Sequence, residues 1–422
     1  MTGVPNKRRL DDSVSSATSK SWGWSWWPGA ACGHEVAELP LIDVRTDMLF
    51  APHTSPRARR RKSSHRASLP SMALPALDPN GLAGCATVDL ILQVSKHSSC
   101  PSGLWHDHIS PLLSAPNMVI LNVGANKGYN LVEYAQRYTD TNVTKSTWFH
   151  LLTNVASPKC ETSCVGTCGG SRDARHRRLK AEAGATVQRL ELHAFELMPA
   201  NGLLLQQLVT ATGLPAEVHR TGVSNASGTM LVQVRPGGSE KGMLVPWSLA
   251  GVSRDSTTMV PVTTIDAFME ARNIESAQLV SIDTEGSDGL VLQGMSRTLA
   301  ARKADVVDFE YSTMWGKWSG RHGLRDALAQ LVSAGYACFW QDDRGMLAET
   351  SGACWSDLLA NLNTPPAWRN LVCSHRPDVL RTLRSLDVAS KCTRCATCPC
   401  SRTSKVCRSA CEQGKTLANR TE

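Results

Sequence analysis

Hydrophobic runs and helix-like stretches alternate along the chain from about residue 85 onward. Residues 118–123 are apolar except for one Asn, which is typical of a strand buried on both faces, and residues 129–138 have the spacing of an amphipathic helix. Strands and helices that alternate in this way are typical of βα units, whose parallel strands share one sheet. The sequence therefore predicts an α/β protein.

The same criteria predict further elements toward the C-terminus. Strands are expected at residues 190–196, 216–223, 278–283, 304–311 and 336–341. Helices are expected at residues 199–212, 264–272, 287–299 and 323–334. About fifty residues separate the first helix from the second strand, where about 2 to 6 are usual. We interpret residues 139–189 as an insertion, and we prefer a tolerated loop to a lid or a partner surface.

Both ends of the chain differ from this central part. Residues 1–85 mix Ser, Pro, Arg and Lys with a cluster of Trp and show no sustained period, so we interpret them as mostly disordered. Residues 86–385 are then the α/β domain, and residues 386–422 are a Cys-rich tail. No run reaches the ~20 apolar residues of a membrane span. We expect an intracellular protein, with the cytoplasm as the first choice and organellar targeting left open.

The net charge of +8 is concentrated in one basic tract. The tract consists of Arg57, Arg59, Arg60, Arg61, Lys62 and Arg66. Such a tract can attract phosphate groups, but a solvated tail is the preferred interpretation, and we do not expect nucleic acid as a partner.

Six cysteines crowd the last 31 residues, and three more lie in the insertion. The tail contains Cys392, Cys395, Cys398, Cys400, Cys407 and Cys411. Its spacing matches neither a paired zinc site nor an iron–sulfur run, so metal binding, disulfides and a reducible disordered tail stay open.

One glycine turn stands directly between the first strand and the first helix. Its sequence is Asn122-Val-Gly124-Ala-Asn126-Lys-Gly128. Glycines there allow the backbone to turn tightly and to approach a ligand, and the helix start offers free amide groups. The spacing matches neither the dinucleotide fingerprint nor the phosphate loop.

Carboxylates follow three of the predicted strands. Glu196 ends the second strand, Asp283 and Glu285 follow the strand at 278–283, and Glu310 lies at the end of 304–311. Ligands of open α/β sheets bind at the carboxyl edge, where such residues gather. An acid at the end of the second strand is suited to accept the hydroxyls of a ribose.

These motifs together resemble the FkbM-type methyltransferases, a branch of the class I S-adenosylmethionine-dependent enzymes. Five blocks carry the resemblance between about residues 117 and 315. They are Val123 to Gly128, Phe195-Glu196 with Pro199, Gly222 to Gly228, Val262 to Asp266, and Ile282 to Gly286 with Leu292-Gln-Gly294. The resemblance implies a Rossmann-like, seven-stranded, mostly parallel sheet with helices on both faces.

The resemblance also implies a cofactor, S-adenosylmethionine, and a small-molecule acceptor such as a sugar hydroxyl. Asn122, Gly124, Asn126 and Gly128 are then expected around the cofactor's methionine portion. Asp283 is also expected among the cofactor-binding residues. Glu196 is expected at the ribose, and Val223 with Ser224 at the adenine. Members of the family generally carry an acid at the position of Asn122, so this amide supplies no charge to the cofactor.

Methyl transfer to a hydroxyl needs alignment of donor and acceptor, and it benefits from a base. Asp283 and Glu285 are the first candidates for the base or for orienting the acceptor, followed by Glu310. We expect no metal, because the cleft motifs lack a dense set of Asp and His. His106 and His108 are expected at the surface.

Two alternatives remain from other classes of function. A methyltransferase-like binding or scaffold protein, using the basic tract and the Cys-rich tail, is kept open by Asn122. A nicotinamide oxidoreductase is disfavoured, because the glycine spacing does not fit and the Asp283 block would be unexplained.

Overall fold

The computed structural model describes the central part of the chain. The described residues are 85, 91, 94, 103–155, 187–233, 244–245, 257–315, 323–343, 345–357 and 368–388. The predictions about the Trp cluster, the basic tract, the cysteines of the insertion and the Cys-rich tail concern residues outside these ranges. None of the helices within them is long and apolar enough to cross a membrane.

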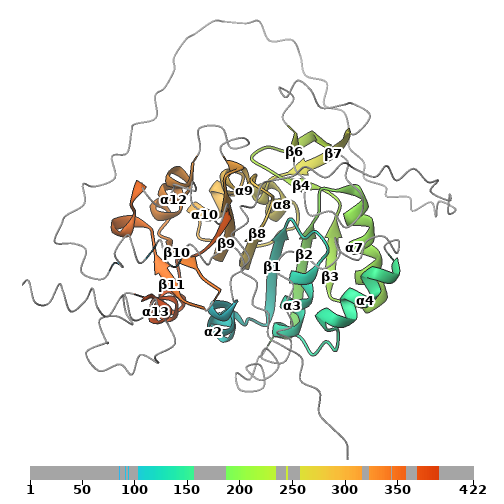
Figure 1. Cartoon of the computed structure of the whole chain (residues 1–422), viewed down its shortest axis with the longest axis horizontal. Coiled ribbons are helices and arrows are strands. Elements are labelled where there is room, and N and C mark those ends of the chain that lie inside the picture. The colour runs from blue at the N-terminus through green and yellow to red at the C-terminus, as the bar shows by residue number, and fades with distance from the viewer. Residues whose placement is uncertain are drawn as a thin grey trace, which may run out of the picture. The chain divides into compact units, whose positions relative to one another are not determined.

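The core of the molecule is an eight-stranded sheet with the order β11-β10-β12-β9-β8-β1-β2-β3. Its strands are β1 (Asn117–Val123), β2 (Arg189–Phe195), β3 (Ala216–His219), β8 (Ala277–Ile282), β9 (Ala304–Ser312), β10 (Ala337–Gln341), β11 (Leu347–Glu349) and β12 (Trp368–Ser374). The run from β9 to β3 is parallel, whereas β12, β10 and β11 each pair antiparallel with their neighbours. The predicted mostly parallel α/β sheet is confirmed, with one strand more than the seven expected. Figure 1 shows the sheet between its helices.

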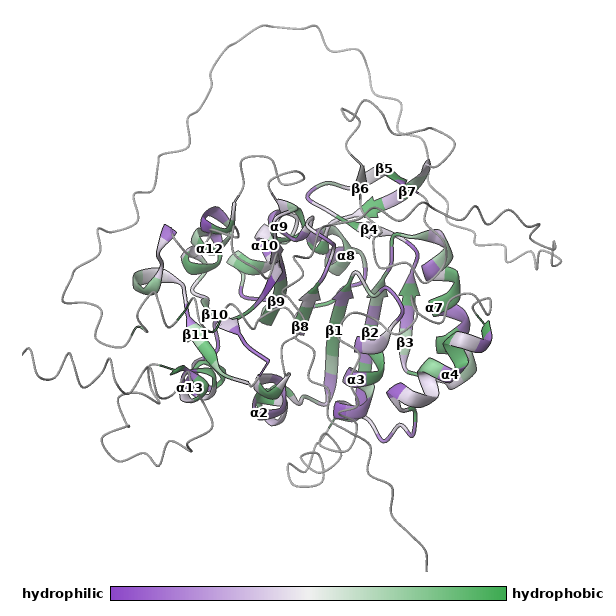
Figure 2. Cartoon of the chain, in the orientation of Figure 1, coloured by the Kyte–Doolittle hydropathy of each residue, from purple (hydrophilic) through white to green (hydrophobic). Residues whose placement is uncertain are grey.

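Successive side chains of a strand point to opposite faces of the sheet, and here both faces carry apolar side chains. Helices therefore cover both faces. On β1, Met118 and Ile120 pack toward one face, and Val119 and Leu121 toward the other. The first face carries α2 (Leu104–Leu113), α3 (Tyr129–Tyr138), α4 (Lys145–Val155), α7 (Pro199–Thr212) and α13 (Pro377–Leu386). The second carries α8 (Ile265–Ala271), α9 (Asp288–Gln293), α10 (Ser296–Ala300) and α12 (Leu324–Ser333). The central strands are accordingly hydrophobic along most of their length (Figure 2).

A second, four-stranded sheet lies at the carboxyl end of β3, with the order β4-β7-β5-β6. Its strands are β4 (Gly222–Val223), β5 (Gly228–Gln233), β6 (Leu244–Val245) and β7 (Thr257–Thr263). The single strand predicted at 216–223 is therefore wrong, since β3 and β4 belong to different sheets. The chain leaves the large sheet after β3, and the Thr221 hydroxyl donates a hydrogen bond to the Pro261 carbonyl, 2.9 Å away, on β7.

The helix predicted at 287–299 is also divided, into α9 and α10. Gly294 ends α9, and a Cβ atom on this residue would lie 2.0 Å from the carbonyl oxygen of Ser224. The chain passes the Ser224 carbonyl too closely for any larger residue. This contact, which the local periodicity does not reveal, is where the two short helices meet.

Part of the predicted insertion is not a loop. Residues 145–155 form α4, whose Trp148 is fully buried between α3 and α7. The Trp148 ring nitrogen donates a hydrogen bond to the Lys127 carbonyl at 2.7 Å, inside the glycine turn. The preferred interpretation as a tolerated loop is therefore wrong for residues 145–155. This helix stabilises the glycine turn through the Trp148 side chain.

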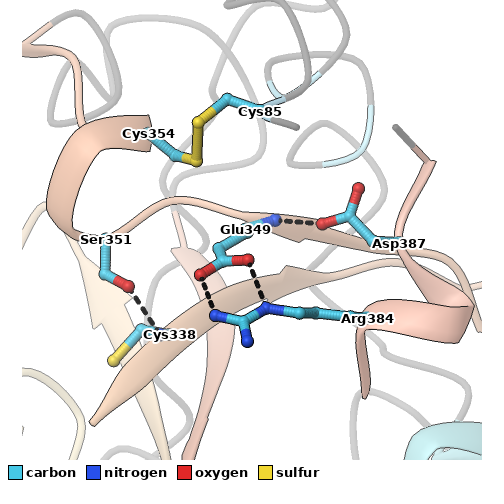
Figure 3. Close-up of a disulfide and its surroundings, with 7 residues drawn as sticks. All are labelled: Cys85, Cys338, Glu349, Ser351, Cys354, Arg384 and Asp387. Atoms are coloured by element: carbon cyan, nitrogen blue, oxygen red, sulfur yellow. Dashed lines mark hydrogen bonds and ion pairs between the residues drawn. A yellow bond between two sulfur atoms is a disulfide. The ribbon is translucent and has the colours of Figure 1, made fainter. Parts of the chain in front are cut away.

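Figure 3 shows side-chain contacts and one disulfide, Cys85–Cys354, near the far edge of the large sheet. Arg384 donates to both carboxylate oxygens of Glu349 at 3.0 and 2.9 Å. One disulfide joins Cys85 to Cys354, and a second joins Cys338 to Cys373.

His106 is buried, contrary to the surface position expected from the sequence, whereas His108 is exposed. His106 shares a hydrogen bond of 2.8 Å with the Tyr138 hydroxyl. Next to it, the Arg137 guanidinium donates to one Asp107 oxygen at 3.0 and 2.7 Å, and both side chains are 3% exposed. The buried ion pair thus fastens α2 to α3, the helix that follows the glycine turn.

We predict that Asp107→Ala destabilises the fold. The change removes the main partner of a buried guanidinium, which typically costs about 3–5 kcal/mol, and we expect the lower end because Glu133 still binds Arg137. Urea unfolding followed by circular dichroism measures the loss. The neighbouring exposed His108→Ala should stay within about 0.5 kcal/mol of the wild type. Equal stability of both variants would contradict the prediction.

Candidate active site

The candidate site lies at the carboxyl edge of the large sheet, where the strand order reverses. From β1 the chain builds the sheet toward β2 and β3, and later from β8 toward β9 on the other side. Val123 at the end of β1 is paired with both Phe195 of β2 and Ile282 of β8. Ligands of open α/β sheets bind at such a switch point. The three strand ends therefore bring Gly124, Glu196 and Asp283 to one place.

Gly124 makes this meeting possible. Its φ is +82°, and a Cβ atom on it would lie 1.8 Å from the Asp283 carbonyl oxygen. The amides of Gly124 and Ala125 both donate to the Phe195 carbonyl, at 3.0 and 2.9 Å. Only glycine fits a position with both a left-handed backbone and backbone contact on the Cβ side. Gly124 thus allows the ends of β1, β2 and β8 to meet, independently of any contact with a ligand.

Gly128 and Asn126 serve the turn in different ways. Gly128 has a left-handed backbone with φ of +81°, which favours glycine, and a Cβ atom on it would lie 2.5 Å from Leu205 of α7 and 2.8 Å from Trp148 of α4. Asn126 has a left-handed backbone with φ of 48°, and its amide donates to a Glu196 carboxylate oxygen at 2.7 Å. Of the two residues, Asn126 is the one that is joined directly to the acid at the edge.

Glu196 is buried at the end of β2, with 3% of its surface exposed. Its second carboxylate oxygen accepts a hydrogen bond from the Met198 amide at 2.7 Å. Burial raises the pKa of Glu196 to about 7, aided by the charge of Asp283 and opposed by the two backbone amides. Each oxygen still has a free lone pair, so the carboxylate can accept hydrogen bonds from hydroxyl groups of a ligand.

Asn122 is fully buried within β1, and neither polar atom of its side-chain amide has a hydrogen-bond partner among the described residues. It pairs in register with Ser281 of β8, which in turn pairs with Asp308 of β9. The Ser281 hydroxyl acts to lower the pKa of the Asp308 carboxyl and that of the Tyr134 hydroxyl on α3, against the effect of burial. Because buried amides are nearly always satisfied, Asn122 is a polar group in need of a partner beside the strand ends.

The acids after β8 and β9 form a group around Asp283. Asp283 is exposed, whereas Glu285 and Glu310 are half-buried. Burial, followed by the charge of Asp283, raises the pKa of Glu310 to about 10. A raised pKa favours the protonated form of Glu310, which can donate a hydrogen bond. Asp283 is the member of the predicted pair most open to an incoming molecule.

Asp288 is a member of this group that the sequence reasoning missed. It is fully buried at the start of α9, and it accepts hydrogen bonds from the Thr284 hydroxyl at 2.8 Å and the Glu310 amide at 3.2 Å. Asp288 thus holds the turn after β8 against the end of β9. The available signal was an acid in the first turn of a helix that follows the Asp283 block.

Val223 and Ser224, the residues expected at the adenine, are both buried at the end of β4. The Ser224 amide donates to the Thr263 carbonyl at 2.9 Å, and its own carbonyl faces Gly294. This segment therefore lies on the α8–α9 side of the sheet edge.

Two of the sequence blocks serve to position this segment. The Thr264 hydroxyl caps α8 by accepting from the Ala267 amide at 3.0 Å. The Asp266 carboxylate accepts from the amides of Arg297 and Thr298 at 2.9 and 2.8 Å, which ties α8 to α10. The threonine–aspartate block and Leu292-Gln-Gly294 are thus explained by packing.

A mostly parallel sheet covered by helices on both faces, with a glycine turn after the first strand and an acid after the second, is the architecture of the Rossmann-like α/β proteins. Within this class, the chain belongs to the FkbM methyltransferase family, because the model of the "Methyltransferase FkbM domain" matches residues 122–338. The match begins at Asn122 and includes all the predicted site residues.

One solved structure similar to this chain is a methyltransferase FkbM from Methylobacillus flagellatus KT, at 14% identity and a TM-score of 0.31. The similarity covers 61% of this chain and 44% of that protein, so the chain spans less than half of its length. Among the curated proteins, none matches the sequence.

The burial of Asp288 predicts a specific pH dependence. Burial, followed by the charge of Asp283, raises the pKa of Asp288 from 3.8 to about 7. The folded protein then binds more protons than the unfolded chain between these values, so stability falls as the pH rises through that window.

Asp288→Asn, which cannot ionise, should gain roughly 2–3 kcal/mol relative to the wild type between pH 5 and pH 8. Urea unfolding at both pH values measures this difference. Asp357→Asn, at an exposed position, controls for the loss of one carboxylate and should show no such change. A pH-independent difference between Asp288→Asn and the wild type would refute the assignment.

Proposed function

We propose that the protein transfers a methyl group from S-adenosylmethionine to a hydroxyl group of a sugar or another small metabolite. The observation that carries this proposal is the carboxylate of Glu196, buried at the switch point with both oxygens oriented by backbone amides. A carboxylate so placed is suited to the two hydroxyls of a ribose. Membership of the FkbM methyltransferase family supports the reaction class.

The residues at the edge fit the cofactor in both polarity and position. The Glu196 carboxylate would hold the ribose, and the segment Val223–Ser224 would lie along the adenine. Asn122 would supply its unsatisfied amide to the amino-acid end, although as an amide it adds no charge. When bound, the cofactor supplies a methyl group made electrophilic by a sulfonium.

The acceptor hydroxyl would be held and deprotonated by acids of the same edge. Asp283 is exposed and adjoins the glycine turn through its own backbone, since its amide donates to the Val123 carbonyl at 2.9 Å. We assign Asp283 as the base and Glu285 as a group that orients the acceptor. The raised pKa of Glu310 gives it a different task, donation of a hydrogen bond to an acceptor oxygen.

A polyhydroxylated acceptor suits this arrangement. Asp283 and Glu285 offer acceptors for hydroxyl protons, while a protonated Glu310 offers a donor, and a sugar carries adjacent groups that need both. A small saccharide is therefore the acceptor class that we propose. The alternative function, a scaffold without turnover, would use the same site but does not account for acids with different pKa values.

Binding of the demethylated cofactor product tests the first half of the proposal. Calorimetric titration with S-adenosylhomocysteine should show one site, and Glu196→Ala should weaken binding roughly 10- to 100-fold, because a charge-assisted bond contributes about 1.5–3 kcal/mol. Glu270→Ala, an exposed acid on α8, is the matched control and should bind as the wild type does. Absence of binding by the folded wild type would overturn the proposal.

The second half is tested by turnover. Radiolabelled methyl transfer to a panel of methyl glycosides should fall at least about 100-fold in Asp283→Asn, which removes a general base. Binding of S-adenosylhomocysteine should remain within about threefold, because the amide keeps the shape of the carboxyl group. Unchanged turnover in Asp283→Asn would remove this residue from the role of base.

A further inference from the structure

A second group of polar residues lies away from the methyl-transfer edge, across the strands β2 and β3. His193 of β2 is paired in register with Glu217 of β3, and Phe195 is paired with His219. Side chains two residues apart lie on the same face of a strand. His193, Glu217 and His219 therefore share the face that α8 covers, where Phe268 packs against both imidazole rings.

The ligand-type atoms of these three side chains converge. His193 Nδ1 lies 3.2 Å from His219 Nε2 and 3.6 Å from Glu217 Oε2. One donor atom from each residue can be chosen so that all lie within 4.8 Å of one another. Two nitrogens bound to one tetrahedral zinc ion at about 2.0–2.1 Å would be separated by about 3.3 Å. The two rings are thus already at the separation that a shared ion requires.

Both nitrogen donors of this group belong to imidazole rings, and imidazole nitrogen is the commonest metal ligand in proteins.

We propose that His193, His219 and Glu217 bind one divalent transition-metal ion, with zinc as the best match. Two imidazole nitrogens and one carboxylate oxygen are a donor set that zinc accepts in tetrahedral geometry, with water in the fourth position. The ion would fasten the edge strand β3 to β2. It would stabilise the fold through its preferential binding to the folded state.

The surroundings of His193 supply a suitable outer partner. His193 Nε2 has no hydrogen-bond partner among the described residues, yet it lies 3.8 Å from Glu191 Oε2. With Nδ1 on the metal, Nε2 would carry the proton and point toward this carboxylate. A carboxylate behind a ligating histidine fixes its tautomer and strengthens its bond to the metal.

Arg272 competes with the ion for Glu217. Its guanidinium donates to both carboxylate oxygens, one of them at 3.0 Å, and packs over the Phe268 ring. Because both side chains are partly exposed, this ion pair is weak and can rearrange. The arrangement makes a prediction that a simple hydrogen-bonded pair of histidines does not make: removal of Arg272 should tighten metal binding.

The test compares zinc binding among variants of the full chain, all of which retain the cysteines of the tail. Each is dialysed against buffered free Zn²⁺, and bound zinc per chain is measured by elemental analysis. We expect the double variant His193→Asn with His219→Asn to bind one equivalent less than the wild type. His150→Asn, on the exposed side of α4, is the control and should bind the wild-type amount.

Two single variants complete the test. Glu217→Ala, at a side chain that is 46% exposed, should weaken binding about tenfold or more without loss of the fold. Arg272→Ala should tighten binding about fivefold, which is the effect expected of one surface ion pair.

Equal zinc content in the wild type and in a folded double variant would overturn the proposal. The two rings would then form only a hydrogen-bonded pair. An unchanged affinity in Glu217→Ala would also exclude this donor set. None of these readouts depends on methyl transfer, so the proposal stands or fails separately from the proposed function.

Discussion

The contact on which the candidate site depends is the approach of Gly124 to the carbonyl of Asp283. It joins the ends of β1 and β8 so closely that no side chain fits between them, and the same turn reaches the end of β2 through the Phe195 carbonyl. Three strands that are remote in sequence therefore end at one point. At the other end of the turn, Gly128 packs against Trp148 of α4 and Leu205 of α7. Both ends of the turn are therefore fixed by contacts.

The acids around this point are buried to different extents, so their pKa values are raised by different amounts. Asp283 remains exposed, and its charge adds to desolvation in raising the pKa values of Glu196, Asp288 and Glu310. Several carboxyl groups thus share a small region without all being charged at once, since like charges at close range disfavour ionisation. The consequence is a site that offers both donors and acceptors of hydrogen bonds.

Several residues of the family resemblance are explained by architecture. Thr264 caps α8, Asp266 joins it to α10, and Gly294 allows the chain to pass Ser224. Their side chains or backbones hold the small sheet and its connection to α8 in place beside the edge. The family motifs therefore include residues that support the carboxyl edge of the sheet as well as residues that lie at it.

The sequence by itself determined the α/β class, the helix 129–138 and the positions of Gly124, Glu196 and Asp283 at the edge, because hydrophobic period and strand ends are local properties. Tertiary structure decided the rest. The separation of β3 from β4, the burial of His106 and Asp288, and the pairing of His193 with Glu217 depend on register and on contacts between segments far apart in the chain. A local pattern carries no information about which strand lies beside another. The burial of a side chain, and hence its pKa, depends on those neighbouring segments.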